Sequence, residues 1–123
     1  RFYYCDSGMI PWILLLSIMS ESGTPLSELV RDRAERFPVS GEINRQVADP
    51  DGVMRAVEEE FAPKADAVDY TDGLSVESAR WRFNLRKSNT EPLIRLNVET
   101  RGDRELLGEI TRAVLELVER TPR

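Results

Sequence analysis

The chain has 123 residues, of which 41% are hydrophobic and 32% charged, and its 17 basic and 22 acidic side chains give a formal net charge of −5. This length suits one domain, or one domain with a piece of another, and the acidic balance disfavours general nucleic-acid binding, which depends on neutralising phosphates. The single cysteine excludes an internal disulfide framework, and the absence of histidine excludes His-based metal sites and Ser-His or Cys-His nucleophile pairs.

An apolar run over residues 9–19 predicts the first helix, with Pro11 tolerated in its first turn. The run is shorter than the roughly 20 residues that span a bilayer, and it lacks the basic start and cleavage site of a signal peptide, so we expect no membrane association. A helix that is apolar on most sides normally lies between layers of a larger protein. We therefore expect the start of the chain to come from the interior of a larger protein, and after Gly23 the pattern becomes that of a surface-lying domain.

Helices and a short strand are predicted next along the chain. Thr24 is the expected N-cap of a helix over residues 25–37, because a proline follows it and apolar residues recur at helical spacing. Residues 39–47 suit a short strand, and Asp49 followed by proline repeats the capping signal before a helix over residues 50–61.

From Asp66 onward the apolar period changes from helical spacing to two. Strands are expected at residues 68–70, 74–76, 81–85 and 94–98. The dipeptide Asp72-Gly73 between the first two is a strong hairpin signal, and Asp103 is the expected cap of a long final helix. Runs of neighbouring strands predict an α+β fold with a mainly antiparallel sheet and the helices on one face.

Positive charge is concentrated in one segment of this acidic chain. Residues 80–104 carry seven basic and three acidic side chains, whereas residues 1–79 carry seven basic and fifteen acidic ones. Such a concentration around one hairpin indicates an anion site there.

The loop at the centre of this segment has the residue types that bind phosphate. Its strand is expected to end at Leu85, which places the following residues at the rim of the sheet. Arg86 offers a planar fork of donors, Ser88 and Thr90 offer hydroxyl groups, and Asn89 offers an amide. An ordinary hairpin turn is the alternative, since these residues are common turn formers. The loop has no carboxylate pair, thiol or evident general base, so it favours binding over catalysis.

Other candidates near the loop are open to two interpretations. Arg95 faces the same side of the sheet as Arg82 by strand parity, so it either extends the anion site or pairs with Glu99 or Glu77. The segment Ser40-Gly41-Glu42 is interpreted as the entry to a strand rather than as a functional turn.

Four segments, in order, resemble the α-D-phosphohexomutases, in their phosphomannomutase/phosphoglucomutase branch. The segment Arg86-Lys87-Ser88-Asn89-Thr90-Glu91-Pro92 resembles the family's phosphate-binding loop. Residues 3–11 resemble the stretch before the last helix of the family's third domain, and residues 37–44 and 69–75 resemble the start and middle of its fourth. Asn89 favours mannose or glucose phosphates, because phosphoglucosamine mutases usually have glycine at this position.

The resemblance implies that residues 1–23 are the tail of the family's third domain and that residues 24–123 are its C-terminal domain, with a fold like the TATA-box-binding protein. It implies that Arg86, Ser88, Asn89 and Thr90 hold the non-transferring phosphate of a mannose or glucose 1- or 6-phosphate. Members of the family carry their phosphoserine, Mg²⁺ loop and sugar-recognition loop in other domains, and none of the three is found in these 123 residues. We therefore expect no catalytic or metal-binding residue here and no mutase activity from this piece alone, with Mg²⁺ and the missing N-terminal domains needed in the full-length enzyme.

The resemblance also implies a cytoplasmic enzyme of carbohydrate metabolism, and the ratio of 15 arginines to 2 lysines is compatible with a GC-rich bacterial source. The alternative is a non-enzymatic phosphate- or nucleic-acid-binding interaction module. Such a nucleic-acid module would expose aromatic residues beside its basic ones. Trp81 and Phe83 share the parity of Leu85, so they are expected to face the core, and no nucleic-acid partner is expected. The apolar 9–19 helix is expected to fold back onto the domain, pair with another copy or remain exposed.

Overall fold

The computed structural model describes residues 7–120, which form two compact units, residues 1–35 and 36–123. Each unit is described by itself. The strand end expected within residues 1–6 lies outside the described residues. The units divide twelve residues after the domain boundary expected at residue 23, and that boundary stays a prediction.

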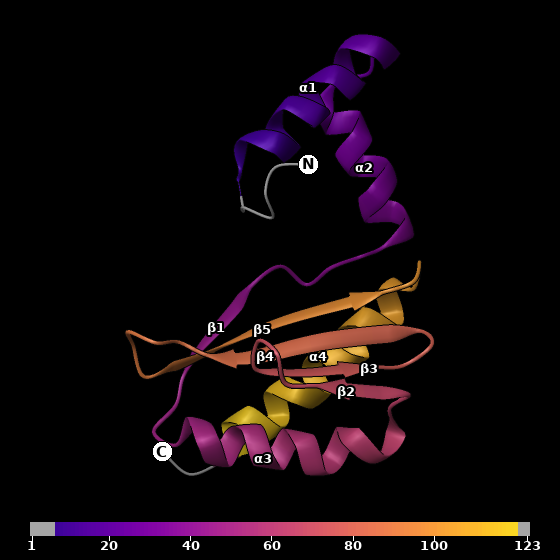
Figure 1. The fold of residues 1–123 in the computed structure, drawn as a ribbon. Helices are drawn as coiled ribbons and strands as arrows, with labels where there is room; N and C mark the ends of the chain where they lie inside the picture. The colour runs from indigo at the N-terminus through magenta and orange to yellow at the C-terminus, as the bar shows by residue number, and fades with distance from the viewer. Residues whose placement is uncertain (1–6, 121–123) are drawn as a thin grey trace. The chain divides into compact units, whose positions relative to one another are not determined.

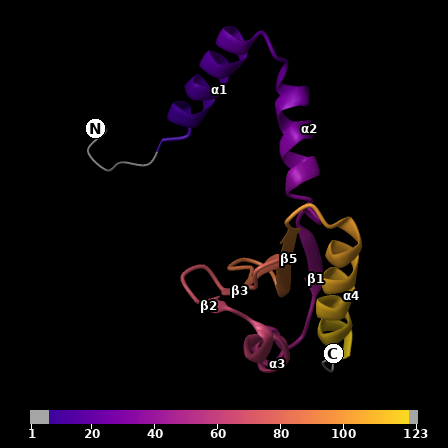
Figure 2. The ribbon, with the colours of Figure 1, turned by 90° about the vertical axis from the view of Figure 1, so that its right-hand side faces the viewer.

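The first unit consists of two helices, α1 (Met9–Ser22) and α2 (Leu26–Arg36, whose last residue belongs to the second unit), as the sequence predicts. Gly23 ends α1 in the left-handed region, with φ of +65°, and Figure 2 shows the two helices joined there. None of the residues of α1 is buried, although apolar side chains lie on all of its sides. No helix within residues 7–120 is both long and apolar enough to cross a membrane.

The second unit is a five-stranded antiparallel sheet with helices packed on one face, which confirms the predicted α+β class. The strand order is β1-β5-β4-β3-β2, and Figure 1 shows α3 and α4 on the same side of the sheet. The elements are β1 (Ile43–Gln46), α3 (Pro50–Phe61), the short 3₁₀ helix η1 (Ala62–Lys64), β2 (Ala67–Asp69), β3 (Leu74–Glu77), β4 (Trp81–Lys87), β5 (Leu93–Thr100) and α4 (Arg104–Arg120).

The core lies between the sheet and these two helices. Alternate residues of β4 and β5, together with Leu74 and Val76 of β3, are buried against apolar residues of α3 and α4. Phe61 of α3 packs edge-on against Trp81 and Phe83, with ring centroids 5.8 and 5.2 Å apart. The prediction that both aromatic side chains of β4 face the core is confirmed.

Local signals in the sequence fix the ends of the elements. The Asp49 carboxylate accepts a hydrogen bond from Gly52 N at 2.8 Å, and the Asp103 carboxylate accepts one from Leu106 N at 2.9 Å. Both are the helix N-caps that the sequence predicts. Gly73 has a φ of +78°, which the turn between β2 and β3 requires.

The opposite face of the sheet carries polar side chains. Arg82, Asn84 and Arg86 of β4 lie opposite Glu99, Asn97 and Arg95 of β5, in that order. Since side chains alternate along a strand, all six point away from α3 and α4. This polar face positions the candidate site.

Candidate functional site

Arg86 lies inside β4, which continues to Lys87. The expectation that the strand ends at Leu85 is therefore wrong. Arg86 and Lys87 pair with Arg95 and Ile94 of β5, and this pairing extends the strand beyond its last apolar residue. The backbone of Arg86 is therefore held by the sheet rather than by a turn, which reduces the entropy lost when this residue binds a ligand.

Two arginines face each other across this part of the sheet. Arg86 and Arg95 are direct cross-strand partners on the polar face. Like charges placed directly opposite each other destabilise a sheet unless an anion lies between them. The expected partners Glu99 and Glu77 pair with Arg82 and Arg101 instead of Arg95. The other interpretation, in which Arg95 extends the anion site, stays a prediction.

Two carboxylates partly neutralise the arginine pair. Glu42 Oε2 lies 3.5 Å from Arg86 Nη2, and Glu42 Oε1 lies 3.9 Å from Arg95 Nη1. Asp72 Oδ2 lies 3.4 Å from Arg86 Nη1. All three separations exceed the 2.7–2.9 Å of a good charge-assisted hydrogen bond. The guanidinium groups therefore keep donor capacity that these carboxylates do not use well.

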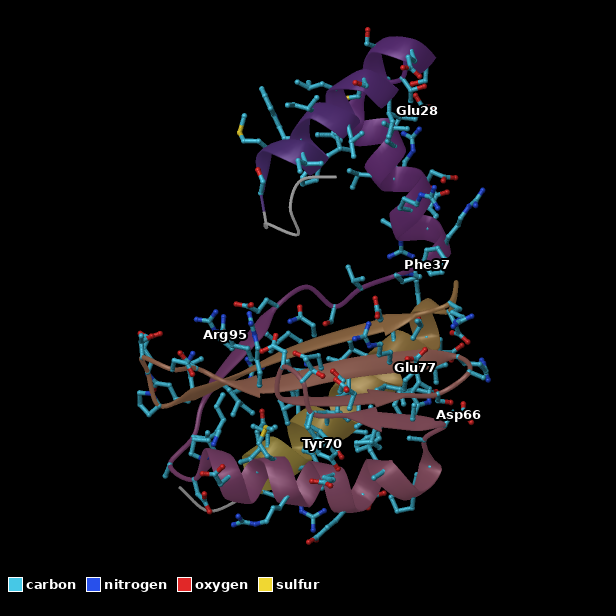
Figure 3. The ribbon with its side chains drawn as sticks, in the orientation of Figure 1. Glu28, Phe37, Asp66, Tyr70, Glu77 and Arg95 are labelled. Carbon is cyan, nitrogen blue, oxygen red and sulfur yellow. The ribbon has the colours of Figure 1, made fainter. Side chains whose placement is uncertain are left out.

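The Nε atom of Arg95 is the clearest sign of unused donor capacity. It is buried and lacks a hydrogen-bond partner within residues 7–120. Figure 3 shows Arg95 on the side of the sheet away from α3. Leaving a buried donor unpaired costs free energy, which an incoming acceptor would recover.

The loop from Ser88 to Pro92 continues directly from Arg86. Ser88 N donates to Leu93 O at 2.9 Å and closes the hairpin. Ser88 Oγ lies 3.5 Å from Thr90 Oγ1 and accepts a hydrogen bond from Thr90 N at 3.4 Å. The two hydroxyl groups are thus brought together, and Asn89 lies exposed between them.

Lys87 ties this end of the hairpin to helix α3. Its Nζ lies 2.7 Å from Asp51 Oδ1, in the first turn of the helix. The hydrogen bond and charge of Lys87 lower the pKa of the Asp51 carboxyl from its ordinary value. Lys87 belongs to the helix side of the sheet by strand parity, so its charge is directed away from the arginine pair.

These side chains suit anion binding. Guanidinium groups and hydroxyl groups supply hydrogen-bond donors in a fixed arrangement, and Arg is suited to bidentate contact with phosphate or carboxylate. Within residues 7–120, no group of three or more Asp, Glu, Cys or His side chains is placed to hold a metal ion.

Sequence reasoning missed Glu42 as a member of this cluster. It was interpreted only as part of a strand entry, yet β1 pairs with β5 and brings this carboxylate beside Arg95. The alternation of Glu42 with Ile43 could have placed it on the polar face. The pairing of β1 with β5 over about fifty residues of sequence leaves no local signal.

The comparisons with known proteins agree with this architecture. Residues 42–117 match the family described as Phosphoglucomutase/phosphomannomutase, C-terminal domain. The chain is 56% identical over 117 residues to a phosphomannomutase of Salmonella montevideo, with 95% of this chain and 26% of that protein covered. It is 50% identical over 118 residues to a protein named phosphohexose mutases of Xanthomonas campestris, with 96% of this chain and again 26% of the relative covered.

A solved structure shows the same fold. A phosphoglucomutase/phosphomannomutase family protein of Burkholderia thailandensis superposes with a TM-score of 0.61 at 22% identity, covering the whole of this chain and 26% of that one. The chain thus spans about a quarter of the length of the relatives it matches.

Proposed function

Since the chain belongs to the phosphoglucomutase/phosphomannomutase family and corresponds to its C-terminal domain, we propose that it binds the phosphate group of a hexose phosphate through Arg86, Ser88, Asn89 and Thr90. The substrate would be a mannose or glucose phosphate undergoing interconversion of its 1- and 6-phosphates. In this role the domain positions the phosphate that is not transferred. Positioning matters because phosphoryl transfer needs in-line geometry.

The observation that supports this proposal is the cross-strand pair of Arg86 and Arg95. Arg86 and Arg95 are held opposite each other by strand register, and the buried Nε of Arg95 has no hydrogen-bond partner among residues 7–120. Such a site would gain stability when an anion enters. The hydroxyl groups of Ser88 and Thr90 lie close together at the end of the same strand. They add neutral donors beside the charged ones.

Catalysis belongs, in this proposal, to other parts of a longer protein. A phosphoserine and a Mg²⁺ ion held in other domains would carry the chemistry, and this chain alone would not perform the mutase reaction. Residues 1–23 would be the end of the preceding domain, where other elements cover the apolar helix α1. The resemblance to the family also supports a cytoplasmic location.

A titration tests the proposal directly. Mannose 6-phosphate or glucose 6-phosphate added to the chain should shift the backbone amide resonances of residues 86–90 in ¹H–¹⁵N spectra, and Arg86→Ala should remove the effect. Arg101→Ala is a matched control, because Arg101 is an exposed arginine that pairs with Glu77 outside the site. Tight binding of single-stranded RNA without a response to sugar phosphates would instead favour a nucleic-acid-binding module.

A second test uses a full-length enzyme that contains this domain. Arg86→Ala should raise KM sharply while the phosphoserine still forms, because the substitution removes a substrate contact and leaves the phosphorylated residue untouched. Unchanged kinetics would contradict the assignment of the loop.

A further inference from the structure

Glu42 is the carboxylate that touches both arginines of the candidate site. It lies 3.5 Å from Arg86 and 3.9 Å from Arg95, and its side chain is 40% exposed. Asn44 Nδ2 donates to Glu42 Oε1 at 3.3 Å, which holds the carboxylate over the pair. Asp72, by contrast, contacts Arg86 alone and is 75% exposed.

The position of Glu42 sets the charge that an incoming anion meets. With Glu42 and Asp72 in place, the two guanidinium charges are balanced by two carboxylate charges. An incoming anion must therefore displace one of these carboxylates before it meets a net positive charge. A carboxylate held beside its partner in the same chain competes at an effective concentration in the millimolar range or above.

Displacement of this kind discriminates between anions by charge. A phosphomonoester carries about −1.5 to −2 at pH 7 and offers three acceptor oxygens. A phosphodiester carries a single charge, as a carboxylate does. Replacing the Glu42 carboxylate by a phosphodiester therefore gains little binding free energy. The contacts of Glu42 are longer than a good charge-assisted hydrogen bond, so they are weak enough for a dianion to replace.

We infer that Glu42 determines the specificity of the arginine pair by acting as a built-in competitor, so that the site accepts phosphomonoester dianions and rejects singly charged anions, phosphodiesters included. The inference rests on the proposed function, since it concerns the same phosphate site. It assigns to Glu42 a role separate from that of the loop residues: Glu42 lowers the affinity for every anion and thereby selects the doubly charged ones.

The test compares methyl phosphate with dimethyl phosphate at pH 7.5 on the 123-residue chain, followed by ¹H–¹⁵N spectra. The chain should bind methyl phosphate and show no saturable response to dimethyl phosphate. Glu42→Gln keeps the oxygen that Asn44 contacts and removes the charge. It should lower the dissociation constant for methyl phosphate about tenfold, as expected for removal of one charge within a few ångströms, and it should gain binding of dimethyl phosphate.

Glu99→Gln is the matched control, because Glu99 is a carboxylate on the same face that pairs with Arg82 at 3.3 Å. It should leave both affinities unchanged. Glu42→Ala repeats the test without a side-chain amide and should act in the same direction. Combining Glu42→Gln with Arg86→Ala should abolish the gain.

Two outcomes would overturn the inference. One is a Glu42→Gln variant that binds methyl phosphate more weakly than, or equally to, the unaltered chain, which would make Glu42 a positioning residue or a bystander. The other is equal binding of dimethyl phosphate before and after the substitution. Neither result affects the proposed function, which fails separately if Arg86→Ala leaves the binding of hexose phosphates unchanged.

Discussion

Gly73 packs directly against the backbone of Arg86. A Cβ atom at position 73 would lie 2.7 Å from Arg86 Cβ, 2.9 Å from Arg86 Cα and 2.6 Å from the carbonyl oxygen of Leu85. The turn between β2 and β3 thus lies directly against Arg86 on β4 and sets the position of this arginine of the candidate site.

Replacing Gly73 by alanine is therefore expected to destabilise the fold and displace Arg86. The φ of +78° strains any residue with a Cβ, and the close contacts with backbone atoms add a clash that must be relieved by movement of β4. We expect a loss of at least about 2 kcal/mol in the free energy of unfolding, measured by urea denaturation.

Gly102→Ala separates the two contributions to that loss. Gly102 has a similar φ of +73°, but the nearest atom to its Cβ position is 3.8 Å away. Gly102→Ala should show the conformational strain alone, so its loss in the free energy of unfolding should be smaller than that of Gly73→Ala. Equal losses at the two positions would show that the clash with Arg86 does not contribute to the destabilisation caused by Gly73→Ala.

Arg95→Met is expected to separate stability from anion binding. The substitution keeps much of the apolar stem and removes both the like-charge opposition to Arg86 and the unpaired buried Nε. The Tm without phosphate should therefore equal or exceed that of the unaltered chain. The rise in Tm on adding inorganic phosphate, which follows from binding to the folded state, should be lost.

Arg82→Met serves as the comparison for Arg95→Met. It breaks a cross-strand pair of opposite charges, with Arg82 Nη1 and Glu99 Oε1 3.3 Å apart. It should lower the Tm slightly and keep the response to phosphate. A large drop in Tm for Arg95→Met would contradict the view that this arginine is retained for binding rather than for stability.

The stability of the domain should fall in acid through Asp103. The hydrogen bond from Leu106 N, with help from Arg80, holds the pKa of the Asp103 carboxyl below its ordinary value of 3.8. The unfolded chain therefore binds this proton more readily than the folded one. The resulting stabilisation is present above about pH 4 and is lost as the pH falls through the folded-state pKa.

Asp103→Asn tests this pH dependence, because asparagine still caps a helix but does not titrate. Its Tm should fall less steeply than that of the unaltered chain between about pH 5 and pH 3, followed by circular dichroism. Parallel curves for the two proteins would show that Asp103 does not contribute to the acid sensitivity.

Helix α1 is expected to drive association of the isolated chain. It presents large apolar side chains on all sides and has no buried residue, and an exposed apolar patch of several hundred Å² favours self-association. Sedimentation velocity should show a concentration-dependent shift for the 123-residue chain. The double substitution Leu14→Glu and Ile18→Glu, which puts two charges on one side of the helix, should weaken it. A chain that stays monomeric at high concentration, with α1 in water, would contradict the prediction.

Much of the fold follows from local patterns in the sequence. Asp49 and Asp103 each precede a helix and cap it as expected, and the Asp72-Gly73 turn joins β2 to β3. These features were predictable because each depends on a few neighbouring residues. The burial of Phe83 and Leu85 followed from their parity in the strand.

The parts of the site that were not predictable depend on pairing between distant strands. Arg86 was expected in a loop because the apolar alternation of β4 ends at Leu85, but β4 continues to Lys87 through hydrogen bonding to β5, which a pattern of side chains does not reveal. Glu42 was missed for the same reason, since only the pairing of β1 with β5 brings it to the arginines. The phosphate-binding role of Ser88, Asn89 and Thr90 follows from the chemistry of their side chains and stays a prediction.

The strict alternation along β4 and β5 has one more consequence. The same register that buries Phe83 and Leu85 turns Arg86 and Arg95 outward, so a slip of one residue would send the guanidinium groups into the core and the aromatic ring into water. A chain misaligned by one residue would therefore lose its core packing together with the proposed anion site. Under the proposed function, binding of phosphate would report that these strands are correctly aligned, so phosphate would serve as a probe of correct folding for this domain.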